Sequence, residues 1–293
     1  MMPSILTIGN FDGVHIGHRQ LISTTIALAR SWCGQAIAVT FTPHPRQFFA
    51  PIDNFFLYPQ NIKKILLNSL GLDDILYLPF KDIYQLTPLQ FFENILLPLE
   101  PAAIVLGNNF TFGANKAGNL DLLRTFCASH DIALHSLTMT PYKGQPVSSS
   151  RIRTAIQQGQ ITIANEMLGL PYTLYGEIQS GAKRGHTLGF PTANIHPKEQ
   201  VIPKIGVYAT LAQIDGDATI FPSVTAVTQT PTFDQVSPRI ETHILGFNRN
   251  IYGCQLSVKL IGFIRDEITF TSKEALIAQL QSDCCQARNI LGL

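Results

Sequence analysis

The chain has 293 residues, of which 45% are hydrophobic and 14% charged, and its formal net charge is +1. This composition excludes a disordered or polyelectrolyte chain, and the length fits two domains better than one core. The sequence has no block of Lys and Arg to support a long nucleic-acid surface, and no apolar run long enough for a membrane span. No signal segment precedes the first expected strand, and the five cysteines form no metal-ligand pattern. We therefore expect a cytoplasmic protein with reduced thiols that binds neither nucleic acid nor membrane; its oligomeric state is not encoded in any motif.

Up to about residue 170, short apolar runs alternate with helical patterns. Strands are expected at 5–8, 36–41, 75–78, 103–106 and 133–137, and helices at 19–30, 62–70, 88–97, 120–130, 151–158 and 161–168. The alternation predicts an α/β doubly wound parallel sheet in residues 1–170. Ligands of such sheets bind beyond the carboxyl ends of the strands.

The pattern changes after Pro171. Strands are expected at 173–179, 207–213, 224–227, 241–245 and 256–263, and a last helix at 272–291. Several short strands separated by turns, without intervening helices, are typical of an antiparallel sheet. We expect residues 171–293 to form an antiparallel β-barrel domain with a C-terminal helix.

The first expected strand runs into the turn Gly9–Gly13 and then into a helix that begins near two histidines. His15 and His18 are three residues apart and can share one face of the first helical turn. The free N–H groups and the dipole of a helix start favour an anion there. Two imidazoles at this position can bind a phosphoryl group and stabilise charge in its transition state. The alternative is that His18 merely caps the helix and His15 lies on the surface.

Three further stretches follow expected strands or precede a helix. Residues 40–45 (TFTPHP) form a loop restricted by two prolines, and residues 107–113 (GNNFTFG) combine glycines with phenylalanines that can border a flat ring. Residues 148–153 (SSSRIR) offer hydroxyls, amides and two guanidiniums to a polyphosphate. The alternative for this last stretch is an ordinary helix cap with surface arginines.

Together these ordered motifs closely resemble the bacterial bifunctional riboflavin kinase/FMN adenylyltransferase family, also called FAD synthetase. The resemblance extends into the second half through LGFPTAN (188–194), GVY (206–208), ETHI (241–244) and IYG (251–253). It implies that the first domain joins AMP from ATP to FMN and releases pyrophosphate. It also implies that the second domain transfers the γ-phosphate of ATP to riboflavin.

The resemblance assigns roles in the first domain. His15 and His18 are expected to stabilise the transition state at the α-phosphate. Arg153, with Ser148 and Ser149, is expected to hold the departing pyrophosphate with Mg²⁺, and Ser150 is expected to bind nucleotide or flavin. The remaining residues expected to bind nucleotide or flavin are Gly9, Asn10, Phe11, Asp12, Gly17, Asn109 and Phe110.

In the second domain the resemblance makes Glu241 the base that accepts the proton of the riboflavin hydroxyl. Thr192 and Asn194 are expected to coordinate Mg²⁺ and the ATP phosphates, since oxygen ligands suit a hard cation. The alternative for Glu241 is a solvated residue on an exposed strand face. The other residues expected to bind nucleotide or flavin here are Gly181, Lys183, Arg184, Gly189 and Pro191.

The chain departs from the family pattern at four places. Asn109 replaces an Asp and Lys116 an Arg, while His186 and Thr230 each stand where the family has an Arg. Loss of a guanidinium removes a charge and a bidentate donor, so the kinase half carries the larger departures. One alternative is therefore an adenylyltransferase whose β domain is a kinase-inactive flavin-binding or structural module. Another, from a different class, is a non-catalytic flavin-binding or interaction protein.

Overall fold

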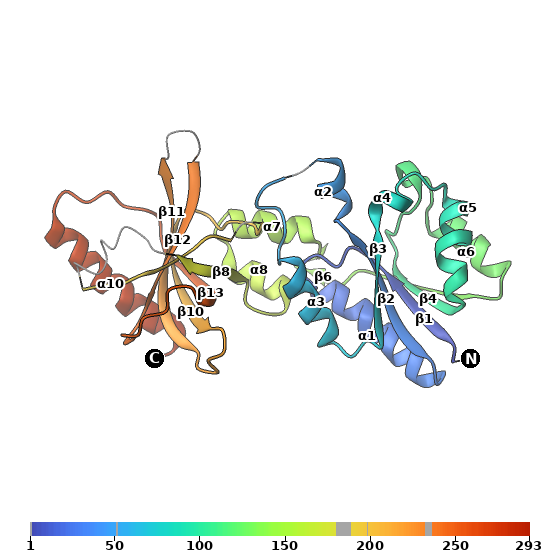
Figure 1. Ribbon diagram of the computed structural model, residues 1–293, viewed down its shortest axis with the longest axis horizontal. Helices are drawn as coiled ribbons and strands as arrows, with labels where there is room; N and C mark the ends of the chain where they lie inside the picture. Colours follow the sequence, from blue (N-terminus) through green and yellow to red (C-terminus); the bar gives the residue numbers. More distant parts are fainter. Residues whose placement is uncertain (1, 51, 180–188, 198, 232–235) are drawn as a thin grey trace. The chain divides into compact units, whose positions relative to one another are not determined.

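The computed structural model describes residues 2–50, 52–179, 189–197, 199–231 and 236–293 (Figure 1). The chain divides into two compact units. The first consists of Met1–Ile52 and Pro59–Ser148, and the second of Asp53–Tyr58 and Ser149–Leu293. We call the segment Asp53–Tyr58 the strap, because it comes early in the chain yet belongs to the second unit. The expected domain boundary near residue 170 stays a prediction.

The first unit is built on a five-stranded parallel sheet with the order β3-β2-β1-β4-β5. Each strand coincides with an apolar run predicted from the sequence, so the doubly wound fold class is confirmed. The order places β1 at the centre, where its five residues are all buried. The strands are β1 (Ser4–Ile8), β2 (Gln35–Thr42), β3 (Asp74–Pro79), β4 (Pro101–Gly107) and β5 (Ala133–Leu137).

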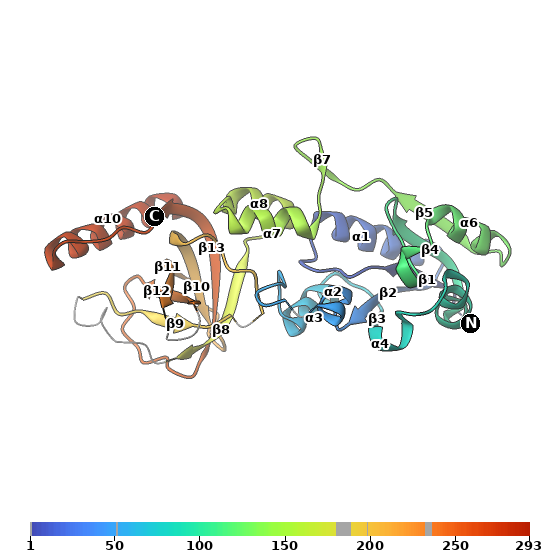
Figure 2. The same cartoon turned by 90° about the horizontal axis from the view of Figure 1, so that it is seen from above.

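Both faces of this sheet are covered by helices (Figures 1 and 2). Alternate residues of a strand point to opposite faces, so Ile5 packs with Leu21 of α1 while Leu6 packs with Phe92 and Leu123. On one side lie α1 (Ile16–Ser31) and α3 (Gln60–Asn68). On the other side lie α5 (Pro88–Phe91), its continuation η1 (Phe92–Leu96) and η2 (Leu97–Leu99), and α6 (Leu120–Ala128).

Several short elements of the first unit are not predicted from the sequence, because each is too brief to show a period. They are α2 (Pro45–Phe49), α4 (Phe80–Ile83), η3 (Ala114–Lys116) and the hairpin of β6 (Pro141–Tyr142) and β7 (Gln145–Pro146). The next two helices match the expected ones: α7 (Ser149–Gln157) and α8 (Ile161–Leu168). Both belong to the second unit, which resumes directly after Ser148.

The second unit contains a closed barrel with the order β10-β11-β12-β9-β8-β13, and its pairings are antiparallel. This confirms the predicted barrel with a C-terminal helix. The three-residue strand β9 is the one that the sequence pattern misses. The elements are β8 (Thr173–Gln179), β9 (Ala193–Ile195), β10 (Gly206–Ile214), β11 (Phe221–Pro231), β12 (Val236–Ile244), β13 (Gln255–Arg265) and α10 (Lys273–Leu291).

Helix α10 packs on the barrel through its apolar face. Cys284 and Ala287 of the helix join a buried cluster with Val207 and Ala209 of β10 and Val224 of β11. All five cysteines of the chain are free thiols. Within the described residues, no helix is both long and apolar enough to cross a membrane.

Candidate active sites

The turn after β1 places the two histidines at the start of α1. His15 is the N-cap residue, and its Nδ1 accepts a hydrogen bond from the backbone N–H of His18 at 3.4 Å. Its side chain is buried, with 2% of the residue exposed. The alternative with His18 as the cap and His15 on the surface is therefore wrong, because the cap is His15 and it lies inside the fold.

The two imidazoles are stacked, with ring centroids 3.6 Å apart and planes 17° from parallel. Phe11 meets His18 edge to face at 5.4 Å and is itself fully buried, so its ring supports a histidine rather than an open surface. A Cβ at Gly17 would lie 3.1 Å from Cε of Met139 and 3.3 Å from the His15 ring, so any side chain there crowds both. The glycine of the motif thus gives the His15 ring its space.

Burial keeps both histidines neutral at pH 7. Desolvation lowers the pKa of His15 from 6.5 to about 4. Desolvation, with smaller effects of His15 and Lys63, holds the pKa of His18 well below its ordinary value. The Nδ1 of His18 is buried without a hydrogen-bond partner among the described residues. A bound anion raises such pKa values and offers hydrogen-bond acceptors, so the pair is suited to a phosphoryl group.

The same turn contains backbone in a region that side chains rarely adopt. Phe11 has a φ of 50° and Val14 a φ of 42°, with Gly13 at 83° between them. Left-handed backbone at a non-glycine residue costs on the order of 1 kcal/mol or more and persists only where the surroundings impose it. The conformation of the turn therefore depends on contacts from outside it.

One such contact is Lys63, which the sequence motifs do not contain. This residue of α3 is 5% exposed. Its Nζ donates to the carbonyl oxygen of Asn10 at 3.1 Å and to Oγ1 of Thr40 at 3.3 Å. Burial lowers the pKa of Lys63 to about 8, against an opposing effect of Asp12. A lysine in a helical pattern usually indicates a solvated face, so no sequence signal marks this one.

An aromatic cluster lies at the carboxyl ends of β2 and β3. Within it Phe48 contacts Phe80 at 5.4 Å and Tyr84 at 5.0 Å, measured between ring centroids. Phe49 is 66% exposed, so this cluster presents an open aromatic surface. The predicted TFTPHP loop leads into it, and His44 caps α2 through its Nδ1. We call Phe41, Phe48, Phe49, Phe80 and Tyr84 the aromatic cluster.

The predicted residues after β4 lie at the carboxyl edge of the same sheet. Asn109 is exposed, and Phe110 is stacked on Phe112 with centroids 5.7 Å apart. A Cβ at Gly107 would come within 2.9 Å of the sulfur of Met139, which explains a glycine at the end of this strand. The first unit thus brings the predicted GNNFTFG loop, the TFTPHP loop and the histidine turn to one edge.

The predicted SSSRIR stretch straddles the two units. Ser148 ends the first unit, whereas Ser149, Ser150 and Arg153 belong to α7 of the second. Nε of Arg153 donates to the carbonyl oxygen of Phe55 in the strap at 2.8 Å, and its guanidinium lies 4.0 Å from the centroid of the Phe55 ring. The structure therefore places Arg153 on the strap within the second unit.

Among the cavities in the described part of the second unit, two lie beside the expected kinase residues. The first, of about 300 Å³, is lined by Pro191, Thr192, Thr242, Arg249 and Tyr252 among others, and we call it the Tyr252 cavity. The second, of about 210 Å³, has apolar walls from β11 and α10 and contains Glu241, so we call it the Glu241 cavity. Thr192 lines both cavities, so molecules bound in the two cavities would both lie next to this residue.

The expected kinase residues lie together at this junction. Glu241 of β12 pairs in register with Asn194 of β9. Its side chain is 32% exposed, lies 3.3 Å from the guanidinium of Arg239 and faces the Glu241 cavity. The side chain is thus half-buried beside a cavity, and its role as the base stays a prediction. Oδ1 of Asn194 is buried without a hydrogen-bond partner among the described residues, as expected of a ligand-binding oxygen.

The segment 189–191, which precedes β9, is held by His243. Its Nδ1 is 2.8 Å from the carbonyl oxygen of Pro191, and its ring contacts Phe190 edge to face. Gly189 has a φ of 84°, which favours glycine at that position. The expected binding residues Gly181, Lys183 and Arg184, and the departure at His186, lie outside the described residues.

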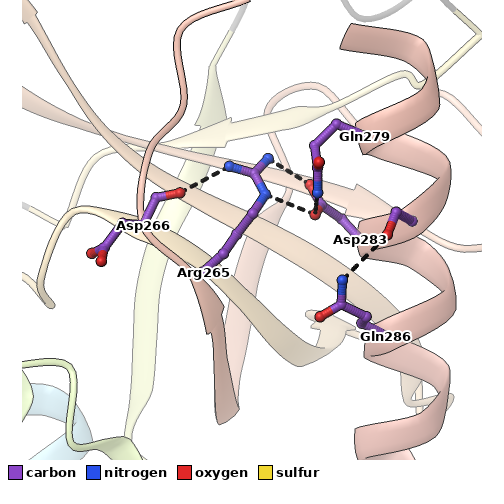
Figure 3. Close-up of polar contacts among 6 residues, drawn as sticks. Arg265, Asp266, Gln279, Asp283 and Gln286 are labelled. Atoms are coloured by element: carbon purple, nitrogen blue, oxygen red, sulfur yellow. Dashed lines mark hydrogen bonds and ion pairs between the residues drawn. The ribbon is translucent and has the colours of Figure 1, made fainter. Parts of the chain in front are cut away.

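A buried ion pair joins β13 to α10 (Figure 3), and both of its residues line the Glu241 cavity. Arg265 of β13 binds both carboxylate oxygens of Asp283, with Nε to Oδ1 at 2.8 Å and Nη2 to Oδ2 at 2.6 Å. Gln279 donates to the same carboxylate at 2.8 Å, and Asp283 is 1% exposed. Bidentate pairing of this kind fixes geometry as well as charge, so it sets the distance between α10 and the barrel. No motif of the sequence marks either residue.

Comparison with known proteins matches each half of the chain to a family model. Residues 2–151 match the family model described as FAD synthetase, and residues 168–291 match that described as riboflavin kinase. A bifunctional riboflavin kinase/FMN adenylyltransferase of Listeria monocytogenes is 34% identical, with 95% of this chain and 90% of the relative covered. The Escherichia coli K12 protein with the same description is 31% identical, with 99% and 93% covered.

The chain belongs to the family of bifunctional riboflavin kinase/FMN adenylyltransferases. The resemblance inferred from the motifs is confirmed, and the comparisons favour the bifunctional reading over an adenylyltransferase alone. A crystal structure from Streptococcus pneumoniae is similar, with a TM-score of 0.90 and 28% identity over 98% of this chain and 94% of that one. That protein is described as a macrolide-efflux protein, so its description names a different role from that of the curated relatives.

Proposed function

We propose that the protein converts riboflavin to FMN at the barrel and FMN to FAD at the α/β unit, using ATP for both steps. The observation that carries this proposal is the presence of two separate constellations: the stacked His15 and His18 in one unit, and Thr192, Asn194 and Glu241 in the other. Each unit contains its own candidate chemistry, so the product of the second can serve as the substrate of the first.

In adenylyl transfer, a phosphate oxygen of FMN attacks the α-phosphorus of ATP and the bond to pyrophosphate breaks. No covalent enzyme intermediate is needed when both reactants are held in line. The neutral imidazoles of His15 and His18 donate N–H groups to the oxygens on which charge develops. Mg²⁺ would neutralise part of the charge of the leaving pyrophosphate when bound, and the assignment of Ser148, Ser149 and Arg153 to that group stays a prediction of the resemblance.

The flavin of FMN needs an apolar, flat surface near the same edge of the sheet. The aromatic cluster supplies one, because the ring of Phe49 is largely exposed and Phe48 and Tyr84 support it. Offset or edge contacts between aromatic rings contribute beyond the burial of area. Asn109 and Phe110, after β4, line the nucleotide from the neighbouring loop.

In riboflavin phosphorylation, the 5′-hydroxyl oxygen attacks the γ-phosphorus of ATP, its proton passes to Glu241, and ADP leaves. We assign ATP to the Tyr252 cavity and the flavin to the apolar Glu241 cavity, because the two meet at Thr192. The unpartnered Oδ1 of Asn194 and the hydroxyl of Thr192 are suited to hold Mg²⁺. When bound, this ion screens the charge of the transferring phosphate.

We place both reactions in the cytoplasm, where ATP is available and free thiols persist; all five cysteines are free in the structure. The test is to give purified protein riboflavin, ATP and Mg²⁺ and to separate the flavins by chromatography. FAD formed from riboflavin supports both activities. FAD formed only from supplied FMN supports an adenylyltransferase with an inactive barrel, and no turnover from either flavin refutes the proposal.

A further inference from the structure

Lys63 is a buried ammonium group to which the proposed chemistry gives no task. It lies on α3 with 5% of the residue exposed, whereas Lys64, next to it on the same helix, is exposed. Removing a cation from water is unfavourable unless it is paired and hydrogen-bonded. The contacts of Lys63 must therefore offset the cost of burying its charge.

The contacts of Lys63 join the carboxyl ends of two strands to the histidine turn. Nζ donates to the carbonyl oxygen of Asn10, which follows β1, and to the hydroxyl of Thr40 on β2. That hydroxyl in turn donates to the same Asn10 oxygen at 3.3 Å. Both lone pairs of the Asn10 carbonyl are thereby occupied just before the left-handed residues Phe11 and Val14.

The charged and titratable groups that face Lys63 come from each element around it. Asp12, in the turn, is 3% exposed and favours the charged ammonium. Lys63 in turn lowers the pKa of His18 on α1. Tyr77 of β3 lies with its ring centroid 5.9 Å from Nζ, and burial raises its pKa, so it stays neutral. Among these groups, Lys63 is the one that titrates in mildly alkaline solution, with a pKa of about 8.

We propose that Lys63 is a positioning residue for adenylyl transfer, whose ammonium group holds the Asn10 carbonyl and the Thr40 hydroxyl and thereby presents His15 and His18 to the α-phosphate. The inference rests on the proposed adenylyltransferase activity and deepens it. Lys63 acts through the turn and touches no reacting atom. Its absence should therefore lower kcat more than it changes KM.

The experiment compares Lys63→Met with Lys64→Met, which removes the same charge from the surface of the same helix. In Lys63→Met we expect kcat for FAD formation from FMN to fall at least about 100-fold, as for loss of one preorganised donor. KM values should stay within about threefold, and FMN formation from riboflavin should be unchanged, because these depend on groups that Lys63 does not hold. Lys64→Met should match wild type in both reactions.

The pH profile separates a positioning role from a purely structural one. Because the folded pKa of Lys63 is about 8, wild-type kcat for FAD formation should fall above that pH as the ammonium is lost. The residual rate of Lys63→Met should show no such fall. A wild-type fall that persists in Lys63→Met, or a kcat in Lys63→Met within threefold of wild type, would overturn the inference.

A second variant covers the case in which Lys63→Met does not fold, as judged by loss of a cooperative thermal transition. Thr40→Val keeps the ammonium and removes one of its acceptors, so we expect kcat for FAD formation to fall about tenfold. An unchanged kcat in Thr40→Val would then overturn the inference. Wild-type protein that forms no FAD from FMN refutes the proposed function and the role of Lys63 with it, whereas active wild type with an equally active Lys63→Met refutes only that role.

Discussion

The histidine pair of the α/β unit and the residues around the Glu241 cavity of the barrel differ in how they are brought together. The histidine pair lies within a single turn, Gly9 to His18, where the two side chains are buried and stacked. The second gathers Thr192, Glu241 and Asp283 from a loop, a strand and the last helix around a cavity. Glu241 keeps a 32% exposed side chain there.

This difference separates preorganisation within a motif from preorganisation by tertiary contacts. The histidine turn depends on its own glycines and one remote lysine. The barrel site depends on the register of β9 with β12 and on the ion pair that holds α10. Each of the following predictions perturbs one site and uses the other reaction as its control.

The largest effect is expected for Glu241→Gln. The amide is nearly the same size as the carboxylate but cannot accept the hydroxyl proton, so FMN formation from riboflavin should fall on the order of a hundred- to ten-thousand-fold. FAD formation from supplied FMN should be unaffected, because that site lies in the other unit. Steady-state rates followed by chromatography check both expectations. Near-normal riboflavin phosphorylation would show that Glu241 is not the base.

Next comes His18→Ala in the first unit. Removing one donor to the transition state should lower FAD formation from FMN about 100- to 1,000-fold, while FMN formation from riboflavin stays intact. Separate assays with FMN and with riboflavin measure the two rates on one preparation. If FAD synthesis stayed within a few-fold of wild type, the assignment of the histidine pair would be wrong.

Asp283→Asn tests whether the ion pair sets the wall of the Glu241 cavity. The substitution leaves the Arg265 guanidinium without its charged partner in a buried place, which should lower the free energy of unfolding by about 3 kcal/mol. Because α10 lines the cavity, KM for riboflavin should rise about tenfold while FAD formation from FMN does not change. Thermal unfolding and riboflavin saturation curves measure these effects. An unchanged KM would mean that the pair stabilises the fold without shaping the cavity.

The smallest effect is expected for Thr230→Arg, which restores the cation that the family carries at this position of β11. If Thr230 weakens the site, phosphorylation of riboflavin should rise a few-fold, because a guanidinium adds a charged bidentate donor. Initial rates at saturating ATP measure it. Brisk turnover by the wild type and no gain in the variant would show that this departure does not limit the kinase.

Much of the architecture can be predicted from the sequence, since each strand of the parallel sheet is an apolar run long enough to be recognised as a strand. Strand β9 could not be predicted, because Ala193–Ile195 is too short for a period and its partners are set by the barrel. The burial of Lys63 and of the pair Arg265–Asp283 could not be predicted for a related reason. From the sequence alone, a charged residue in a helix or at a strand end is expected to be exposed to solvent, and only the tertiary structure shows which contacts bury it.

The strap has a consequence for how the two activities can be separated. The backbone passes between the units three times: after Ile52, after Tyr58 and after Ser148. Leu57 and Tyr58 of the strap are at most 1% exposed, and Gln200 donates to the carbonyl oxygen of Leu57 at 3.1 Å. A protease cut at any one of these three crossings, or a recombination event with its breakpoint there, therefore separates at least one unit from a segment of its own fold. Exchange of either enzyme half between relatives must carry this short segment along with the barrel.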